Sequence, residues 1–340
     1  YIPLNSVTRV LVYPIPRCDS AVFIQFGDAQ WFWTMDATQG YHQLRVAKES
    51  REKLAFQGTN AIKWTYNVMP FGPVNGPSIF IMFAHDVDST WKQLATEEGL
   101  TIDDDTNSNL IVDDILSWAM SFEHGLKFLE CQLRVCQSQN LSLSLKKSHF
   151  FPQRLEFVGV DVCTDGNRPA MSKNQLISTW RTPTIVRDVA SFIGFALFYG
   201  TFIACFELRV KRLREICKLD MSEDVKPHWD PDAQAEFEDI KNALLSDPCL
   251  RRFDHRKRLY LRTDFSALGF GYAALQPGDD EESLAAMHRE IAGGECEFMQ
   301  PNSTLLLHCV SLGRRRCRGY EERLHSHLGE AFALDWAINR

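Results

Sequence analysis

Along the first half of the chain, the spacing of apolar and polar residues alternates between patterns typical of strands and patterns typical of helices. The stretch 31–36 (WFWTMD) is an apolar run of strand length that ends on an aspartate. A second strand from Asn60 leads into a Pro/Gly loop at 70–77, and a helix is expected to begin near Ser78. Residues 108–118 (SNLIVDDILSW) place two aspartates between apolar runs and predict a hairpin.

The pattern continues with a helix and two more strands. An amphipathic helix is expected from Ser121, a good N-cap, to about Gln139. Its expected apolar face consists of Leu126, Leu129, Leu133 and Cys136. Residues 141–151 (LSLSLKKSHFF) alternate with period two, and 155–166 (LEFVGVDVCTDG) form a strand closed by an Asp-Gly turn. The order strand, helix, hairpin, helix, strand is typical of an α+β fold with an antiparallel sheet.

The second half is more helical before it returns to strands. A helix is expected to start at Thr184, and residues 206–250 are charged and helical, which suits a connector. A strand hairpin over 258–275 indicates a second domain. The polar insert that follows, 276–298, is expected to be a loop.

One segment raises the question of a membrane. Residues 189–206 hold 18 residues without a charge, the lower limit for a spanning helix. However, the segment contains glycines and hydroxyl residues, follows Arg187 and Asp188 directly, and has no second segment like it. We expect a buried packing helix and no membrane partner, and the membrane protein is the alternative.

Composition gives wide bounds. A chain of 340 residues with 45% apolar and 24% charged residues is typical of a globular protein with two or more domains. The net charge of −7 gives no overall basic surface for nucleic acid, although basic clusters occur locally. The ten cysteines form no CxxC pair and indicate neither a zinc site nor a disulfide framework. Because the chain starts at Tyr1 and ends within a helical pattern, we expect a piece of a longer protein.

Asp113 and Asp114 are the strongest chemical signal. Neighbouring carboxylates in an apolar turn repel each other and lose hydration, so a cation is expected to compensate them. Asp36, at the end of another strand, completes a trio that could hold two metal ions about 4 Å apart for phosphoryl transfer. A solvated polar turn is the alternative from these residues alone.

The motifs together resemble a known family. In order, the chain contains YPIPRCD, FWTMDATQGYHQLRV, KLAFQ, YNVMPFGPVNGPSIF, VDDIL, LKKSHF, LEFVGVDV, TPTIVRDVASFIGFALFYGTFI and TDFSALGFG. This series resembles the Pol reverse transcriptase of gypsy-like (Metaviridae) long-terminal-repeat retrotransposons, passing into the ribonuclease H domain. The resemblance covers essentially the whole chain.

The resemblance implies a right-hand polymerase fold followed by a truncated ribonuclease H-like α/β domain. The implied parts are fingers and palm at 1–165, lacking the start of the fingers, a thumb at 166–206, a connector at 207–255 and a partial ribonuclease H-like domain at 256–340. The implied activity is RNA- and DNA-directed DNA synthesis from deoxynucleoside triphosphates on a template with a primer. The alternative is an inactive nucleic-acid-binding remnant of a decayed element.

The resemblance also assigns the polymerase site. Asp36, Asp113 and Asp114 match the aspartates that bind two Mg²⁺ ions, with Mn²⁺ possible, and Lys147 matches the lysine that protonates the leaving pyrophosphate. The residues that match nucleotide-binding positions are Ala37, Tyr41, which excludes a 2′-hydroxyl, and Phe71 and Gly72 of the MPFG loop. A core tyrosine and a solvated surface lysine are the plain alternatives for Tyr41 and Lys147.

Primer and template contacts are implied at two places. Phe157, Val158 and Gly159 match the hairpin that grips the primer end. Gly194 and Phe198 match the helix that follows the minor groove, where a glycine permits close approach. For Phe198, plain core packing is the favoured interpretation.

In the second domain, Asp264 and Glu330 match the first two metal-binding carboxylates of ribonuclease H. That enzyme class uses four, so we expect no complete nuclease from this chain. The resemblance further implies that the rest of a Pol polyprotein is a partner and that the protein acts in cytoplasmic retrotransposon particles.

Three departures bear on activity. Ile111 stands where the family has an aromatic residue beside the aspartates, Ser148 replaces a usual cysteine and Ile2 a usual arginine. The loss of the aromatic residue at Ile111 puts efficiency or fidelity in doubt more than metal binding.

Overall fold

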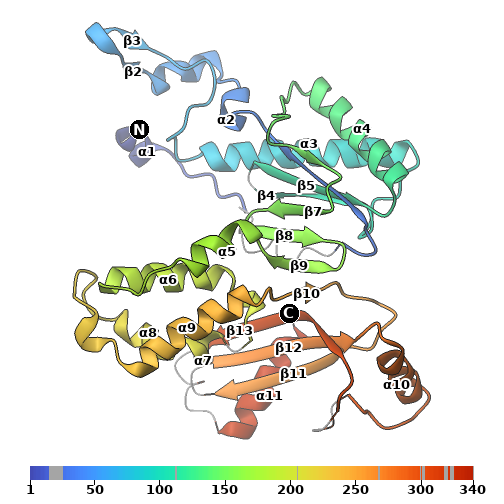
Figure 1. The fold of residues 1–340 in the computed structure, drawn as a ribbon. Coiled ribbons are helices and arrows are strands. Elements are labelled where there is room, and N and C mark those ends of the chain that lie inside the picture. Colours follow the sequence, from blue (N-terminus) through green and yellow to red (C-terminus); the bar gives the residue numbers. More distant parts are fainter. Residues whose placement is uncertain are drawn as a thin grey trace. The chain divides into compact units, whose positions relative to one another are not determined.

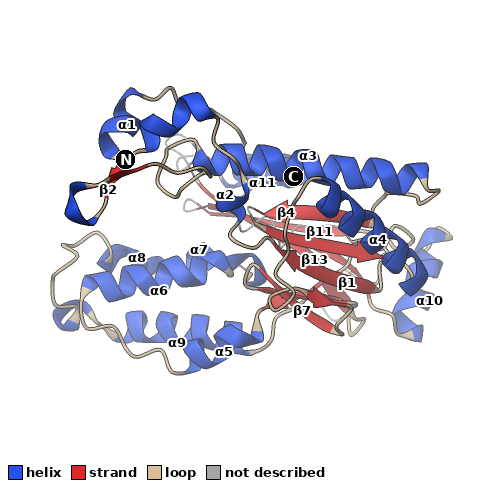
Figure 2. Ribbon diagram, turned by 90° about the horizontal axis from the view of Figure 1, so that it is seen from above, coloured by secondary structure: helices blue, strands red, loops and turns tan. Residues whose placement is uncertain are grey.

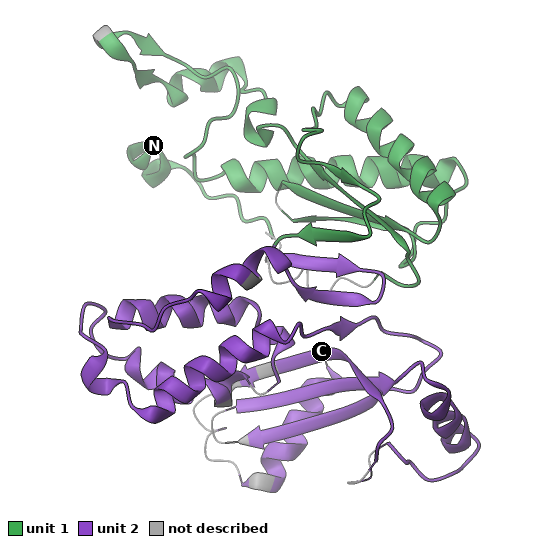
Figure 3. Cartoon of the chain, viewed as in Figure 1, with its two compact units in different colours: residues 1–158 green, residues 159–340 purple. Residues whose placement is uncertain are grey.

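The computed structural model describes residues 1–14, 26–111, 113–204, 206–266, 269–298, 300, 303–317, 321 and 325–339. Within them the chain divides into two compact units, Tyr1–Val158 and Gly159–Arg340, which are coloured separately in Figure 3. Each unit mixes helices with antiparallel sheet, which confirms the expected α+β class.

Unit 1 is built on an antiparallel sheet with the strand order β4-β5-β1-β6. Its helices and strands are α1 (Ile2–Val7), β1 (Trp31–Asp36), α2 (Gly40–Gln43), η2 (Lys48–Leu54), β2 (Phe56–Gln57), η3 (Thr59–Ala61), β3 (Lys63–Trp64), α3 (Gly76–Glu97), β4 (Asn107–Ile111), β5 (Asp114–Ala119), α4 (Phe122–Ser138), β6 (His149–Phe150) and β7 (Arg154–Phe157). The two long helices α3 and α4 pack on one face of the sheet (Figures 1 and 2). The expected hairpin at 108–118 and the helices expected near Ser78 and from Ser121 are confirmed.

The sheet and the helices meet because alternate strand residues face them. Trp33 and Met35 of β1 point into a core with Phe80 and Trp91 of α3 and Phe128 of α4, all buried. The alternate residues of β1 point to the opposite face of the sheet, where the rings of Phe32 and Phe26 meet edge-on with centroids 5.4 Å apart. Asp36 has the same parity as Phe32, so the sheet directs it away from the two helices.

Helix α4 begins where its sequence predicts and buries a different face. Ser121 caps it by accepting a hydrogen bond from the backbone N–H of His124 at 3.2 Å. The expected apolar face is wrong for Leu126 and Leu133, which are exposed, whereas Phe128 and Val135 are buried together with the polar Gln132. Gln132 is buried because its amide bridges two polar groups of the sheet: Trp33 Nε1 donates to its Oε1 at 2.9 Å and its Nε2 donates to Ser117 Oγ at 2.8 Å.

The strand predicted over 141–151 is mostly wrong. Its residues form one bridge, from Leu143 to Ala37, followed by a turn in which the N–H groups of Lys147 and Ser148 donate to the carbonyl of Ser144. Regular pairing with β1 is restricted to His149 and Phe150. The backbone groups of this segment are therefore satisfied around the end of β1 instead of along a ladder.

Unit 2 contains two antiparallel sheets and most of the shorter helices. Its elements are β8 (Val160–Cys163), β9 (Gly166–Pro169), α5 (Met171–Ser178), α6 (Val186–Phe198), η4 (Gly200–Phe202), α7 (Phe206–Arg209), α8 (Lys211–Ile216), η5 (Lys226–His228), α9 (Pro231–Leu245), β10 (Leu250–Arg251), β11 (Tyr260–Ser266), β12 (Gly269–Pro277), α10 (Glu281–Ile291), β13 (Leu307–Arg316) and α11 (Ser326–Ile338). β8 pairs with β9 and β9 with β10, while β12 lies between β11 and β13. The predicted Asp-Gly turn joins β8 to β9, and the strand hairpin expected over 258–275 is β11–β12.

The uncharged segment 189–206 is a packing element in this unit. Helix α6 covers its first part, and Phe192 on it stacks against Phe237 of α9 with ring centroids 4.5 Å apart. Among the described residues, no helix is long and apolar enough to cross a membrane.

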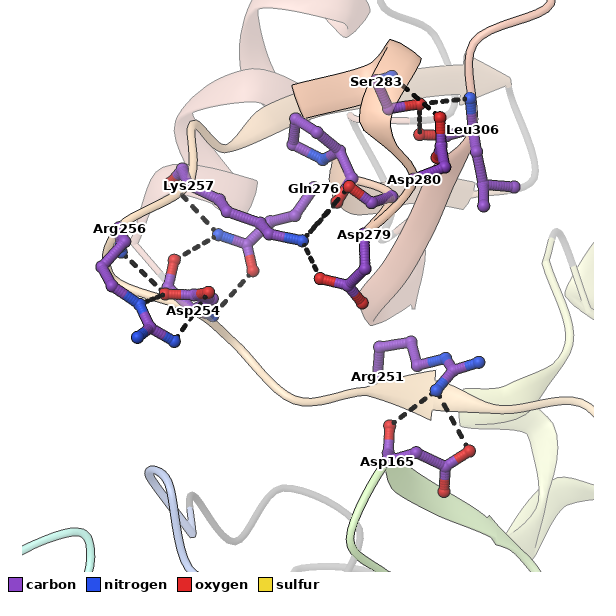
Figure 4. A network of polar contacts seen from close by, with 12 residues as sticks. Asp165, Arg251, Asp254, Arg256, Lys257, Gln276, Asp279, Asp280, Ser283 and Leu306 are labelled. Carbon is purple, nitrogen blue, oxygen red and sulfur yellow. Dashed lines mark hydrogen bonds and ion pairs between the residues drawn. The ribbon is translucent and has the colours of Figure 1, made fainter. Parts of the chain in front are cut away.

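The prediction of a loop at 276–298 is wrong, because this insert contains the helix α10. Asp280 caps the helix by accepting from the N–H of Ser283 at 2.8 Å, and Ala286 and Met287 bury its inner face. A polar network anchors the strand end before it (Figure 4): Gln276 exchanges two hydrogen bonds of 2.8 Å with the backbone of Asp254, and Lys257 Nζ donates to the carbonyl of Pro277 at 2.9 Å.

We expect Gln132→Leu to lower the free energy of unfolding by about 1–3 kcal/mol, because the indole N–H of Trp33 and the hydroxyl of Ser117 lose their buried partner. Urea unfolding followed by circular dichroism measures the change. The matched control is Gln137→Leu, on the exposed face of the same helix. Equal losses in the two variants would contradict the expectation.

Candidate active site

The hairpin β4–β5 and the strand β1 bring Asp36 and Asp114 together. Asp36 is the last residue of β1 and Asp114 the first of β5, and the two are directly paired across the antiparallel ladder. Paired residues share a face of the sheet, so both side chains point away from α3 and α4. Asp113, in the turn, borders a small internal space lined by Ala37 and Phe80.

The turn at 142–148 places a lysine beside this pair. Thr38 N–H donates to the carbonyl of Ser142 at 3.0 Å, and Ser144 N–H donates to the carbonyl of Asp36 at 2.8 Å. The hydroxyl of Ser148 accepts from the N–H of Asp36 at 3.3 Å. Held in this way, Lys147 lies with its Nζ 3.3 Å from Asp36 Oδ2.

The ion pair has one sheltered and one open partner. The Asp36 side chain is 15% exposed and the Lys147 side chain 69% exposed. An exposed lysine gains little from such a pair and keeps its freedom to move to another anion. Lys147 is therefore positioned at the aspartates and is accessible to a phosphate that arrives from solvent.

The electrostatics of the aspartate group are unfavourable without a cation. Burial, together with the negative charges of Asp113 and Asp36, raises the pKa of Asp114 to about 6, while Lys147 opposes the rise. The carboxylates are thus close enough to repel one another, and one lysine does not compensate all of them.

One carboxylate oxygen indicates where a cation could offset the negative charge of the aspartates. Asp36 Oδ1 is buried and has no hydrogen-bond partner, although a buried carboxylate oxygen normally has one. Oxygen ligands of this kind suit Mg²⁺ or Mn²⁺. The residues present therefore fit a divalent ion, although within the described residues no group of three or more His, Cys, Asp or Glu side chains is arranged to hold a metal ion.

Tyr41 stands at the edge of the aspartate group. It lies in the short helix α2 and packs on Phe71 and Phe80, with ring centroids 4.9 and 5.5 Å away. Burial, and then the charge of Asp113, raises the pKa of its hydroxyl. Gly40 lets the helix approach, because a Cβ there would lie 2.6 Å from the Phe80 ring. Tyr41 therefore borders the site, and its ring is supported by the hydrophobic core.

The loop before α3 presents Phe71 beside Tyr41. Gly72 has φ of +109°, a conformation that favours glycine, and Phe71 is exposed next to it. The side chain of Asn5 holds the loop: its Nδ2 donates to the carbonyl of Gly72 and its Oδ1 accepts from the N–H of Val74, both at 2.9 Å. Ala37, buried directly after Asp36, completes the predicted nucleotide positions in this unit.

The predicted primer and template residues lie in different units. Phe157 is buried at the end of β7 in unit 1, followed by Val158 and Gly159 at positive φ of 48° and 78°. In unit 2 the carbonyl of Gly159 accepts a hydrogen bond from the hydroxyl of Tyr199 at 3.0 Å. A Cβ on Gly159 would lie 3.4 Å from the ring of Phe198, so Phe198 packs beside this glycine.

Gly194 is exposed on helix α6. A Cβ at this position would meet nothing within 4 Å. The exposed position leaves room for an approach from outside the chain. The primer and template assignments stay predictions.

The two carboxylates predicted for the ribonuclease H site lie on neighbouring elements, Asp264 on β11 and Glu330 on α11. Phe265 of β11 packs against helix α11, where a Cβ on Gly329 would lie 2.0 Å from its ring. Asp264 precedes Phe265 in the strand and so points to the other face. Asp264 lines a cavity of about 300 Å³ with Arg262, Tyr272 and Gly200. Glu330, on α11, is half-buried, and the pairing of the two carboxylates stays a prediction.

Sequence reasoning missed the supports of the site. Phe80 carries Tyr41, Asn5 shapes the loop at Phe71, and the hydroxyl of Ser148 binds the backbone of Asp36. Ser148 lies beside Lys147 in the LKKSHF motif, where the sequence indicates only a departure from the family. Phe80 and Asn5 gave no signal, because their roles depend on contacts between distant segments.

Comparison with protein families matches two parts of the chain. Residues 3–162 match the model described as reverse transcriptase (RNA-dependent DNA polymerase). Residues 229–306 match the RNase H-like domain found in reverse transcriptase.

The similar curated proteins are transposon polyproteins. The retrovirus-related Pol polyproteins from the transposons opus and gypsy of Drosophila melanogaster are 30% and 28% identical to this chain over 93% and 92% of its length. The transposon Tf2-3 polyprotein of Schizosaccharomyces pombe is 26% identical over 83% of the chain. The chain spans 31%, 29% and 20% of these three relatives.

Solved structures share the fold. A foamy viral protease-reverse transcriptase in complex with double-stranded DNA aligns with a TM-score of 0.75 and 16% identity, over 98% of this chain and 51% of the other. The same type of protein in complex with an RNA/DNA hybrid aligns with a TM-score of 0.74 and 16% identity, over 99% and 40%.

We expect the raised pKa of Asp114 to appear in the pH dependence of stability. The folded state binds the proton of Asp114 more tightly than the unfolded state, so its cost is absent below pH 4 and complete above pH 6. Relative to Asp114→Asn, the wild type should therefore lose about 1–2 kcal/mol of unfolding free energy between these pH values, after allowance for solvent screening.

Urea unfolding at several pH values in the presence of a chelator measures this difference. The control is Asp86→Asn, which changes an exposed aspartate on α3. Parallel pH profiles for wild type and Asp114→Asn would show that Asp114 ionises normally.

Proposed function

We propose that this chain catalyses RNA- and DNA-templated DNA synthesis. The premise is that it belongs to the reverse transcriptases of gypsy-like long-terminal-repeat retrotransposons, with a reverse transcriptase domain followed by an RNase H-like domain. The observation that carries the proposal is the direct pairing of Asp36 with Asp114 beside Lys147. This arrangement combines carboxylates for metal ions with a mobile cation for phosphate.

Divalent metal ions are generally used by this family, and the residues of this chain that would hold two Mg²⁺ ions are Asp36, Asp113 and Asp114. When bound, the ions supply positive charge that neutralises the triphosphate and favours ionisation of the primer 3′-hydroxyl. The unpaired Asp36 Oδ1 and the mutual repulsion felt by Asp114 both support this role, since a cation would relieve each of them.

Lys147 is proposed as the proton donor to the departing pyrophosphate. Its Nζ lies at the aspartates, and its exposure allows the ammonium group to reach a β-phosphate oxygen. Proton transfer from it would neutralise charge that develops on the leaving group.

Tyr41, Phe71, Gly72 and Ala37 are proposed to form the nucleotide pocket. The ring of Tyr41 is fixed against Phe80 and would leave no room for a 2′-hydroxyl, which selects deoxynucleoside triphosphates. The exposed ring of Phe71 beside it offers a surface for the incoming nucleotide.

A template with a primer is the proposed nucleic-acid partner. The solved proteins of similar fold hold double-stranded DNA or an RNA/DNA hybrid, which supports a duplex partner here. Phe157, Val158 and Gly159 would contact the primer, and Gly194 and Phe198 the minor groove.

For the second domain we propose that Asp264 and Glu330 are metal ligands of an incomplete ribonuclease H site. Two carboxylates are fewer than the four that this enzyme class uses, so we expect no cleavage of the RNA strand of a hybrid by this chain. The remaining proposed partner is the rest of a Pol polyprotein, and the proposed location is a cytoplasmic particle, which fractionation of cells that express the element would test.

Primer extension on an RNA template tests the polymerase. We expect incorporation with Mg²⁺, and separately with Mn²⁺, that Asp36→Asn or Asp113→Asn abolishes, because each removes a proposed metal ligand. Lys147→Ala should slow incorporation by about 10² while leaving binding of template and primer intact. Asp86→Asn is the matched control for charge removal.

Absence of incorporation by a folded protein that still binds template and primer would contradict the proposal. That result would instead favour an inactive binding remnant, for which Ile111, buried where the family has an aromatic residue, is the supporting observation.

Metal binding has a readout that does not depend on activity. We expect Mg²⁺ to raise the thermal unfolding temperature of the wild type, because an ion that binds the folded state alone stabilises it. Asp36→Asn and Asp114→Asn should lose this shift, and Asp86→Asn should keep it. Equal shifts in all four proteins would show that Mg²⁺ acts elsewhere.

A further inference from the structure

The β2–β3 hairpin is an isolated two-stranded ribbon in unit 1. Phe56 pairs with Trp64 and Gln57 with Lys63, and η3 joins the strands. Figure 1 shows the ribbon projecting from one end of the unit. A ribbon of two strands without a covering layer is marginally stable in water, so exposed apolar side chains on it call for a separate explanation.

One face of the ribbon is aromatic and open. Phe56 and Trp64 are directly opposite each other and share a face, and Tyr66, two residues after Trp64, lies on it too. The rings of Phe56 and Tyr66 have centroids 5.0 Å apart and an interplanar angle of 35°. Phe56 is 43% and Trp64 56% exposed. Their outer surfaces are therefore free to contact another molecule.

The backbone under Trp64 fixes its ring. A Cβ on Gly58 would lie 2.8 Å from both the Cδ1 and Nε1 atoms of the indole, so only a residue without a side chain fits beneath it. One side of the indole is thus held by the hairpin and the other faces solvent. A ring fixed in this way loses little conformational freedom when a ligand stacks on it.

The same segment carries positive charge in an acidic chain. Residues 45–66 hold five basic and two acidic side chains, a net charge of +3, whereas the whole chain has −7. Lys48, Lys53 and Lys63 are exposed, and within the part of the chain that the structure describes they form no ion pair. Their charge remains available to attract an anion within about one Debye length, about 10 Å.

We propose that the aromatic face of the β2–β3 hairpin binds single-stranded nucleic acid, with unpaired bases stacked on Phe56 and Trp64 and phosphates attracted by the lysines. Proteins that bind single strands without sequence preference combine aromatic rings, on which bases stack, with nearby basic side chains that attract the phosphates. A duplex does not fit this face, because its bases are already stacked on one another. Identification of the strand as the unpaired template rests on the proposed polymerase function, whereas the binding itself does not.

Fluorescence anisotropy with a labelled oligonucleotide tests the proposal, in a chelator and without nucleotides, so that a failure of polymerase chemistry does not affect the result. We expect Trp64→Ala to weaken binding of a single strand about tenfold, the loss typical of one stacking platform, and to leave binding of a blunt duplex unchanged. Lys63→Gln should lower the dependence of binding on salt by about 0.7 in the logarithmic slope.

Two variants control for fold and for simple hydrophobicity. Ile62→Ala removes an apolar side chain of similar exposure, 52%, from the same hairpin and should bind the single strand like the wild type. Phe56→Leu keeps apolar volume but removes a ring, and should weaken binding even if Trp64→Ala fails to fold, which circular dichroism would reveal.

Unchanged affinity of the folded Trp64→Ala and Phe56→Leu variants for the single strand would overturn the proposal. Loss of self-association in sedimentation experiments, with nucleic-acid binding unchanged, would also overturn it and would identify the face as a protein contact.

Discussion

The pairing of β1 with β5 is the constraint on which the rest of the site depends, because it puts Asp36 opposite Asp114 at the end of a ladder built from apolar residues. The core beneath the ladder fixes its register, since a slip by one residue would turn Trp33 and Met35 out of the core and the aspartates into it. Hydrophobic packing therefore supplies the free energy that holds like charges together. The electrostatic cost appears as the raised pKa of Asp114 and the unpaired Asp36 Oδ1. A cation bound at the proposed metal site would relieve both of these costs.

The groups around the aspartates differ in how firmly the core holds them. Tyr41 rests on Phe80, and Gly40 permits the close contact between them. Lys147, by contrast, is held by backbone hydrogen bonds of its turn and by an ion pair in which its own side chain is exposed. The difference suits the proposed roles, because a wall that excludes a 2′-hydroxyl must be rigid whereas a proton donor must follow the leaving group.

The sequence predicted elements well where local signals and tertiary packing agree. The hairpin at 108–118, the cap at Ser121 and the Asp-Gly turn before β9 each depend on a few neighbouring residues. The failures occur where distant contacts decide. Gln132 is polar and yet buried, because Trp33 and Ser117 satisfy its amide, and so the apolar pattern of α4 indicated the wrong face. The alternation in 141–151 looked like a strand, but its N–H groups close a turn around the end of β1.

The candidate site shows the same division between local and distant information. The family resemblance placed Asp36, Asp114 and Lys147 in one site, and the structure brings these three together. It did not reveal that Asp264 and Glu330 lie on elements packed through Phe265 and Gly329, with Asp264 on the opposite face of the strand. Alternation in a strand is a local rule, but which face becomes covered depends on the helix that packs there. An aspartate in a matching motif therefore identifies a candidate ligand, and only the packing of the neighbouring residue decides which partners its carboxylate can meet.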